Sequence, residues 1–198
     1  MRSLYMLGTG FTVFCLAILW FGAPGGRGPV PIVSTPTQAH PPTTQPATSG
    51  PTWFQAAKPF CNALEVETRM QAVPPPATAD GPGWAAACYA LAGKIDAARN
   101  GILELPAGQR SRAASIVFQV GHPVADAGDD ESAGPIMELV LEFWPQNYMA
   151  RYHAGISAYE LGDHELAAKH LAEFLETYHQ DDGWRSNAQA VLARLEQS

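Results

Sequence analysis

The sequence predicts an all-α fold, and three observations support this prediction. From Trp53 onward apolar residues recur with the period of an α-helix, and no stretch alternates apolar and polar residues as a strand would. Proline and glycine punctuate these helical patterns. In addition, the segments 84–103 and 152–171 share one pattern, in which a glycine is followed five positions later by an alanine. A row of similar helix pairs accounts for all three observations.

Charge divides the chain into two parts of different character. Ten of the 12 Lys and Arg residues and all 19 Asp and Glu residues lie in 53–198, which gives this part a formal charge of −9. Its length is that of one ordinary domain. A protein that neutralises phosphate groups would be basic, so the composition argues against a nucleic-acid partner. The abundance of Ala, Gly and Pro, with more Arg than Lys, is typical of a bacterium with a high-GC genome.

Residues 1–23 contain a candidate membrane anchor. Positions 4–23 are twenty consecutive uncharged residues, enough to cross a hydrocarbon core ~30 Å thick as one helix. Tyr5 and Trp20 lie near the two ends, where aromatic rings prefer the headgroup level. A signal peptide would end in a small-x-small cleavage site, whereas here Phe21 would occupy the −3 position. We therefore expect an uncleaved single-pass transmembrane helix, with a cleaved signal peptide as the alternative.

Residues 24–52 have the composition of a disordered spacer. They contain eight prolines, six threonines and no acidic residue, and such a segment cannot bury enough apolar surface to offset its ordering entropy. Where it resembles polyproline it would run extended, at up to ~3.1 Å per residue. Because the amino terminus and Arg2 favour a cytoplasmic N-terminus, we expect the linker to carry the domain on the periplasmic, or another extracytoplasmic, side of the membrane.

The domain at 53–198 is predicted to begin and end with a flanking helix. Residues 54–72 have a helical period, with Pro59 in or near the first turn. Residues 184–197 have the polar face of a capping helix. Asp181 and Asp182 lie just upstream, where a carboxylate can accept hydrogen bonds from the first amides of a helix.

The repeated segments resemble the tetratricopeptide (TPR) repeat, a helix-turn-helix unit of 34 residues. At spacings of 35 and 34, the small residue of the repeat's eighth position falls on Ala86, Gly121 and Gly155. The alanine of the twentieth position falls on Ala98, Ala133 and Ala167. Small side chains at these positions let the two helices of a pair approach closely. The resemblance covers roughly residues 79–180 and implies a short solenoid of helical hairpins; an all-α bundle without repeats is the alternative.

Two prolines bear on the second repeat. Pro145 occupies its closing position, where a proline ends a helix. Pro123 falls where the first helix should continue, so we expect that helix to be short, kinked or replaced by a turn. Downstream, Asp129 or Asp130 is predicted to cap a helix that starts near Ser132.

The TPR resemblance implies a concave groove, lined by the first helix of each pair, that holds a peptide or protein partner. Aromatic and methionine side chains suit this role because they bury much area at low entropic cost. The groove positions are Phe118, His122, Asp126, Met149, Tyr152, Ile156 and Tyr159. Alternatively, Phe118 and Tyr152 belong to the core. The sequence thus predicts a membrane-tethered adaptor or scaffold that binds another protein, without a cofactor.

The acidic segment 121–134 supports an alternative function. It gathers His122, Asp126 and three further acidic residues, whose oxygens could bind a hard cation such as Ca²⁺. The spacing is not that of an EF-hand, and helix capping explains two of the carboxylates. A small-ligand or cation-binding domain centred on residues 122–131 is therefore the alternative to a protein-binding module, and no metal ligand is assigned.

No enzyme is predicted. The chain lacks the HExxH, G-x-S-x-G, P-loop and dinucleotide-binding motifs, and a hydrolase that uses His122 with neighbouring carboxylates is left as a further hypothesis. Three cysteines are too few for a disulfide scaffold. We expect Cys61 and Cys88 to be small buried residues, with a disulfide between them as the alternative if the domain lies outside the cytoplasm.

Overall fold

The computed structural model describes residues 49–197, and this part of the chain is all-helical, without a strand. The helices are α1 (Gly50–Ala57), the 3₁₀ helix η1 (Lys58–Phe60), α2 (Val66–Ala72), α3 (Gly81–Leu91), α4 (Ile95–Leu103), α5 (Ala107–Asp126), α6 (Asp130–Phe143), α7 (Tyr148–Glu160), α8 (His164–Thr177) and α9 (Gly183–Leu195). The all-α prediction is confirmed for this range. The predicted anchor at 4–23 lies outside it, and no helix within it is long and apolar enough to cross a bilayer.

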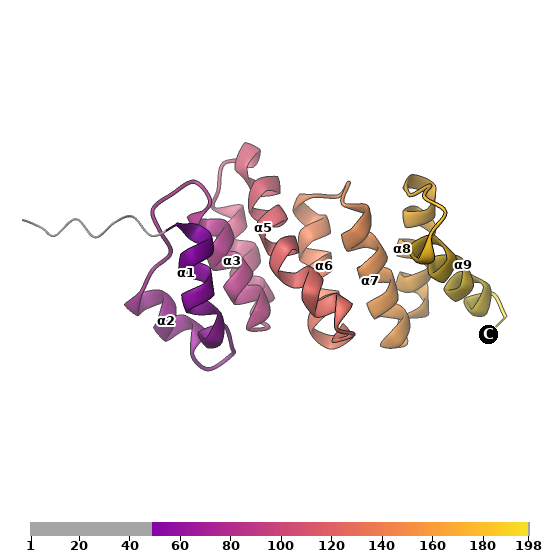
Figure 1. The fold of residues 1–198 in the computed structure, drawn as a ribbon, viewed down its shortest axis with the longest axis horizontal. Helices are drawn as coiled ribbons and strands as arrows, with labels where there is room; N and C mark the ends of the chain where they lie inside the picture. The colour runs from indigo at the N-terminus through magenta and orange to yellow at the C-terminus, as the bar shows by residue number, and fades with distance from the viewer. Residues whose placement is uncertain (1–48, 198) are drawn as a thin grey trace, which may run out of the picture. The chain divides into compact units, whose positions relative to one another are not determined.

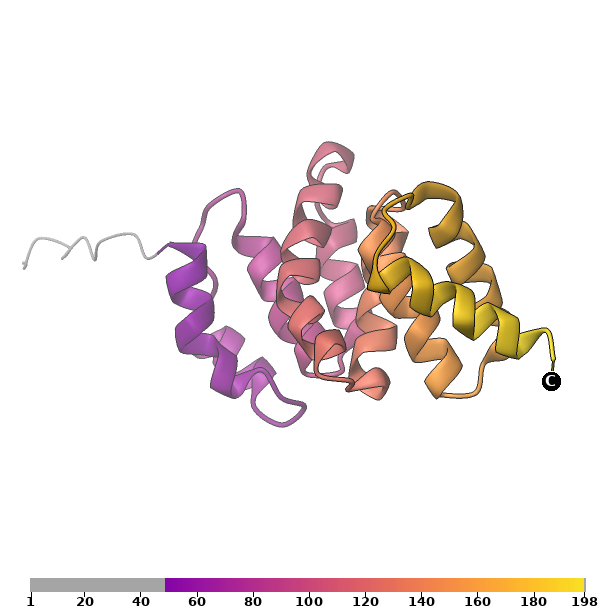
Figure 2. The same ribbon diagram turned by 45° about the vertical axis from the view of Figure 1, so that its right-hand side comes forward.

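From α3 onward the helices follow one another as hairpins. α3 packs on α4, α5 on α6 and α7 on α8, and α9 covers α8 and part of α7. Successive pairs also touch, because α3 lies against α5 and α6 against α7. Figure 1 shows the pairs side by side in chain order, and the turned view in Figure 2 shows the same order.

Three turns of one kind join the helices of these pairs. They contain Gly93, Gly128 and Gly162, whose φ angles are 72°, 73° and 84°, in the left-handed region that glycine adopts without a Cβ clash. In each turn the glycine amide bonds to the carbonyl three residues earlier, and the next amide bonds to the carbonyl five residues earlier. This is the Schellman arrangement, and it recurs at spacings of 35 and 34 residues.

The predicted small residues lie where the helices of a pair meet. A Cβ atom on Gly121 would lie 2.5 Å from Cγ2 of Ile136, and one on Gly155 would lie 2.8 Å from Cδ2 of Leu171. The alanines predicted to face them are fully buried: Ala98, Ala133 and Ala167. Close approach of the paired helices is thus a property of the structure as well as of the sequence pattern.

The prediction of one helix over 54–72 is wrong, because the chain turns between α1 and α2. Pro59 has no amide hydrogen to donate. Oδ1 of Asn62 accepts hydrogen bonds from the amides of Leu64 and Glu65, both at 3.1 Å, and these bonds replace helical ones. At its other end α1 begins at Gly50, three residues before the expected start of the domain.

A disulfide joins Cys61, which follows η1, to Cys88 in α3. The expectation of two separate buried thiols is therefore wrong. Nε1 of Trp53 also donates a hydrogen bond of 3.1 Å to the carbonyl of Val73, within a core segment that includes Phe54 and Ala57. The disulfide and this packing attach the N-terminal helices to the first helix pair.

The twenty-residue α5 continues through Pro123 to Asp126, so the expectation of a shortened helix or a turn is wrong. Pro123 is exposed and lies in the last turn, where the hydrogen bond that it removes can be replaced by water. The helix therefore projects three residues beyond Pro123.

The predicted caps of α6 and α9 are confirmed. The Asp129 side chain accepts a hydrogen bond from the amide of Ser132 at 3.3 Å. The Asp182 side chain accepts from the amides of Trp184 and Arg185 at 3.1 and 3.2 Å. Each carboxylate meets amides that have no partner within their own helix.

Candidate functional site

The seven predicted partner-binding residues come from two neighbouring helices. Phe118, His122 and Asp126 are spaced four apart and therefore share one face of α5. Met149, Tyr152, Ile156 and Tyr159 follow a spacing of three and four on α7. We call the surface formed by these two helices the α5–α7 face.

Tyr152 belongs to the core and is not free to meet a partner. It is 6% exposed and packs against Phe174 of α8 and Trp184 of α9, with ring centroids 5.2 and 5.0 Å away. Its hydroxyl group accepts a hydrogen bond of 2.7 Å from Nδ2 of Asn187. This is the alternative given above for Tyr152, and it arises because α9 packs against this side of α7.

The other α7 positions are partly covered as well. Ile156 and Tyr159 are half-buried and pack against the same C-terminal core as Tyr152. Met149 is half-buried one turn earlier. The accessible part of the α5–α7 face is therefore mainly the strip on α5.

On that strip the side chains of Phe118, His122 and Asp126 form a continuous row. The Phe118 ring stacks on His122 at a centroid distance of 4.9 Å, and it meets the edge of Trp144 at 6.2 Å. The His122 side chain is 30% exposed and the Asp126 side chain 49%. The row is thus apolar at Phe118. At Asp126 it is acidic and exposed to solvent.

His153 was not among the predicted residues, but its ring contacts this row. It lies on α7, is 5% exposed, and meets the His122 ring edge-on at 4.8 Å. Nε2 of His153 and Nε2 of His122 each lie 3.6 Å from Oδ1 of Asp126. These distances exceed normal hydrogen-bond lengths, and both nitrogens are buried without a hydrogen-bond partner.

Burial and, to a lesser extent, the nearby His122 lower the pKa of the His153 imidazole from 6.5 to about 4, although Asp126 and Asp130 act in the opposite direction. His153 is therefore neutral at pH 7. A neutral imidazole keeps one ring nitrogen that can accept a hydrogen bond or bind a metal ion.

Sequence periodicity places His153 on a different side of α7 from the predicted groove. Its helical neighbours are the buried Ala150 and Ser157, so a polar residue on an otherwise buried stripe was the available signal. Its partners on α5 could not be found by periodicity, because their proximity depends on how the second helix pair packs on the third.

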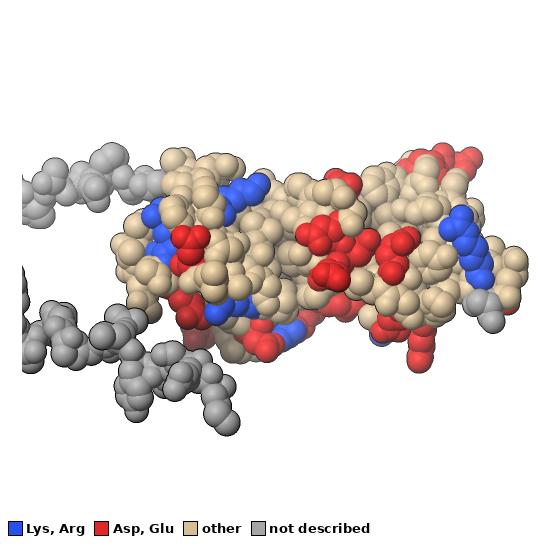
Figure 3. Space-filling view, turned by 90° about the horizontal axis from the view of Figure 1, so that it is seen from below, with Lys and Arg blue, Asp and Glu red and all other residues tan. Residues whose placement is uncertain are grey.

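The surroundings of these residues are acidic. From Ala113 to Ala150 the chain has six Asp and Glu residues and no Lys or Arg. Figure 3, which views the domain from below Figure 1, shows acidic side chains gathered over the middle of the domain, with basic ones towards either end. The end of α5 and the first turn of α6, next to the α5–α7 face, therefore carry acidic residues without a basic residue nearby in the sequence.

The carboxylate oxygens of the predicted cation-binding segment, residues 122–131, are not gathered around one common position. Asp129 caps α6, and Oδ1 of Asp130 accepts a hydrogen bond of 2.8 Å from the Ser157 hydroxyl. Of the residues at 122–131, His122 and Asp126 approach each other, and they do so together with His153. A hard cation prefers six or more oxygen ligands, which this arrangement does not offer.

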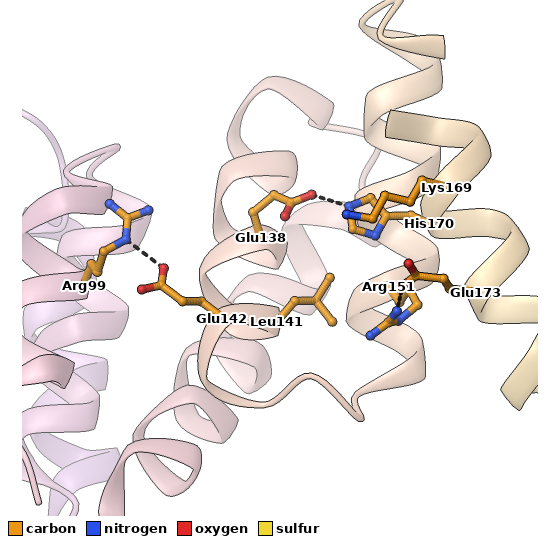
Figure 4. Close-up of a pocket in the computed structure, with 8 residues that line it drawn as sticks. All are labelled: Arg99, Glu138, Leu141, Glu142, Arg151, Lys169, His170 and Glu173. Atoms are coloured by element: carbon orange, nitrogen blue, oxygen red, sulfur yellow. Dashed lines mark hydrogen bonds and ion pairs between the residues drawn. The ribbon is translucent and has the colours of Figure 1, made fainter. Parts of the chain in front are cut away.

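A polar cleft of about 370 Å³ lies elsewhere, on α4, α6, α7 and α8. Figure 4 shows three ion pairs that cross it, which join Arg99 to Glu142, His170 to Glu138 and Arg151 to Glu173. These contacts join neighbouring helices, although Nδ1 of His170 is buried without a hydrogen-bond partner. The charged groups of the cleft are thus largely paired with one another, and no three of them form a cluster like that of His122, Asp126 and His153 among the described residues.

Comparisons of the chain with protein-family models, curated proteins and solved structures return no match.

Proposed function

We propose that the chain is a membrane-tethered, TPR-like adaptor whose helical domain binds a basic segment of a partner protein on the α5–α7 face. The repeat part of this proposal is supported by the three Schellman turns and by the tight contacts of Gly121 and Gly155. Repeat domains of stacked helix pairs bind partners along the surface that the pairs build together.

The observation that carries the binding proposal is the acidic charge next to the α5–α7 face. Asp126 at the end of α5 and Glu131 in the first turn of α6 are exposed, in a stretch without Lys or Arg. Complementary charge speeds the encounter of two proteins and selects among partners. A basic segment with one apolar side chain would match the exposed carboxylates and the ring of Phe118.

A second feature of α5 offers room for such a segment. A cleft of about 240 Å³ lies between α1, α3 and α5, and its lining includes Phe54, Trp84, Val120 and Pro123. Val120 and Pro123 flank His122 on the same helix. A partner that crosses α5 would reach apolar side chains here, and apolar anchors supply most of the affinity in protein interfaces.

The predicted anchor and linker define how the adaptor would act. A span at residues 4–23 and a spacer at 24–52 would confine the domain to a layer next to the membrane. Confinement raises the effective concentration of the domain towards other membrane-bound proteins. A modest affinity of the face itself would then be sufficient.

The test is crosslinking of the full-length protein in native membranes, followed by identification of the proteins that copurify. The double variant Asp126→Asn, Glu131→Gln removes two charges from the face. The matched control Glu176→Gln, Glu196→Gln removes two charges from exposed positions on α8 and at the end of α9.

We expect a basic partner to be recovered with the parent and the control, and to be lost with the face variant or at about 0.5 M salt, where surface charges are screened. Equal recovery with both double variants would overturn the assignment to this face. If the parent recovers no partner at all, the adaptor function itself is wrong.

A further inference from the structure

His122, Asp126 and His153 bring three potential metal ligands together from two helices. Nε2 of each histidine lies 3.6 Å from Oδ1 of Asp126, and all three pairs of ligand atoms lie within 4.8 Å. In a tetrahedral zinc site with bonds of about 2.0–2.2 Å, two ligand atoms lie roughly 3.4 Å apart. Two of the three distances therefore need to change by only a few tenths of an ångström.

His153, the buried residue of the three, lacks the hydrogen-bond partner that a buried polar group normally has. His153 is 5% exposed, and its Nε2 atom is buried without a hydrogen bond. Buried polar atoms nearly always have a partner, yet the nearest carboxylate oxygen stands 3.6 Å away. The same is true of Nε2 in His122. An ion between the three groups would satisfy both nitrogens at once.

The backbone holds two of the ligands close to this arrangement. His122 and Asp126 are four residues apart on α5, so their side chains lie on one face of the helix. Trp184 and Tyr152 pack against the His153 ring at 5.5 and 5.3 Å and thereby restrict its rotation. The ring of His122, which is 30% exposed, has the room to close the third distance.

The ligand types select the class of ion. Two imidazole nitrogens and one carboxylate oxygen suit Zn²⁺ and its first-row neighbours, whereas Ca²⁺ and Mg²⁺ prefer oxygen alone. Three protein ligands leave a fourth position for water or for a group of a bound molecule. We propose that His122, Asp126 and His153 form a binding site for one divalent transition-metal ion of the zinc class, open to solvent on the Asp126 side.

This site shares His122 and Asp126 with the proposed partner-binding face, but its test uses no partner, so the two proposals can fail separately. The detergent-solubilised full-length chain is titrated with Zn²⁺ by calorimetry and with Co²⁺ by visible absorption, which reports the coordination geometry. We expect one ion per chain. The His153→Ala variant should bind at least about 100-fold more weakly, because even the loss of an outer-shell partner weakens metal sites by 10–100-fold.

Two further variants make the result decisive. His179→Ala removes an exposed histidine that lies outside the cluster, and its affinity should equal that of the parent. Asp126→Asn alters a half-exposed side chain without opening the core, and it should weaken binding even if His153→Ala fails to fold.

The same proteins are then heated with and without Zn²⁺, because an ion that binds the folded state raises the unfolding temperature. The parent and His179→Ala should be stabilised by the metal, and Asp126→Asn should not. Equal Zn²⁺ affinity of the parent and Asp126→Asn would overturn the proposal, as would the absence of Zn²⁺ binding by the parent at micromolar concentration.

Discussion

The hydroxyl group of Ser157, in the middle of α7, donates a hydrogen bond of 2.8 Å to Oδ1 of Asp130, the first residue of α6. Ser157 is 1% exposed and lies one helical turn after His153. The bond therefore joins the α5–α6 turn to the helix that carries His153.

The Ser157→Ala variant should lower the free energy of unfolding by about 1–2 kcal/mol, since a buried hydrogen bond to a charged group is lost. Urea denaturation measures this loss. Ser186 donates to a backbone carbonyl at an exposed position, so Ser186→Ala should change stability by no more than about 0.5 kcal/mol. Equal effects of the two substitutions would show that the Ser157–Asp130 bond contributes nothing.

The close contacts of the repeat glycines predict a larger effect. Gly155→Ala would place a methyl group 2.8 Å from Leu171, and overpacking of this kind costs about 1–3 kcal/mol. Gly101 also lies within a helix, α4, but a Cβ atom there meets nothing within 4 Å. Gly101→Ala should therefore stabilise the domain by about 0.5–1 kcal/mol. Thermal unfolding of both variants tests the opposite signs, and stabilisation by Gly155→Ala would contradict the packing described here.

Features of the fold that follow from local sequence were predicted well. The turns at Gly93 and Gly162 contain the glycines of the two segments that share one pattern, and the cap at Asp182 lies just before the predicted last helix; both features depend on a few adjacent residues. The turn between α1 and α2 at Asn62 also depends on adjacent residues, but it was not predicted because the apolar residues of 54–72 keep a helical period. In that case the side-chain bonds of Asn62 to the following amides outweigh helix propensity.

The site was predicted less well because it depends on contacts between helix pairs. His122 and Asp126 were named as groove positions implied by the TPR resemblance, and the structure places them close together. Tyr152 was named on the same ground, with the core as its alternative, and the position of α9 makes it a core residue. His153 was missed because nothing in α7 indicates which residues of α5 lie above it.

The full-length chain has three cysteines, and the disulfide determines which of their thiols can react with an alkylating reagent. Alkylation under denaturing, non-reducing conditions should label Cys15 alone, and reduction should expose Cys61 and Cys88 as well. Mass spectrometry counts the labels, and full labelling of all three thiols before reduction would contradict the disulfide.

Replacement of Cys61 and Cys88 by serine should destabilise the domain by about 3.5 kcal/mol, the value expected from the chain entropy of a loop with a sequence separation of 27 residues. Urea denaturation of the non-reduced parent and of this variant measures the difference. Cys15→Ser is the control, because Cys15 is not part of the disulfide, and it should leave the unfolding midpoint unchanged.

The low pKa of His153 predicts that the domain loses stability in mild acid. The imidazole titrates near 6.5 in the unfolded chain but at about 4 in the folded one, so between these values the unfolded state binds more protons. Stability should therefore fall as the pH drops from about 6.5 to 4, by at most about 3 kcal/mol from this group. Urea denaturation between pH 7 and 4.5, with a chelator present, measures the slope. The variant His153→Gln should have a shallower slope than the parent, while His179→Ala keeps the slope of the parent; identical slopes for all three proteins would mean that His153 is not the group that titrates.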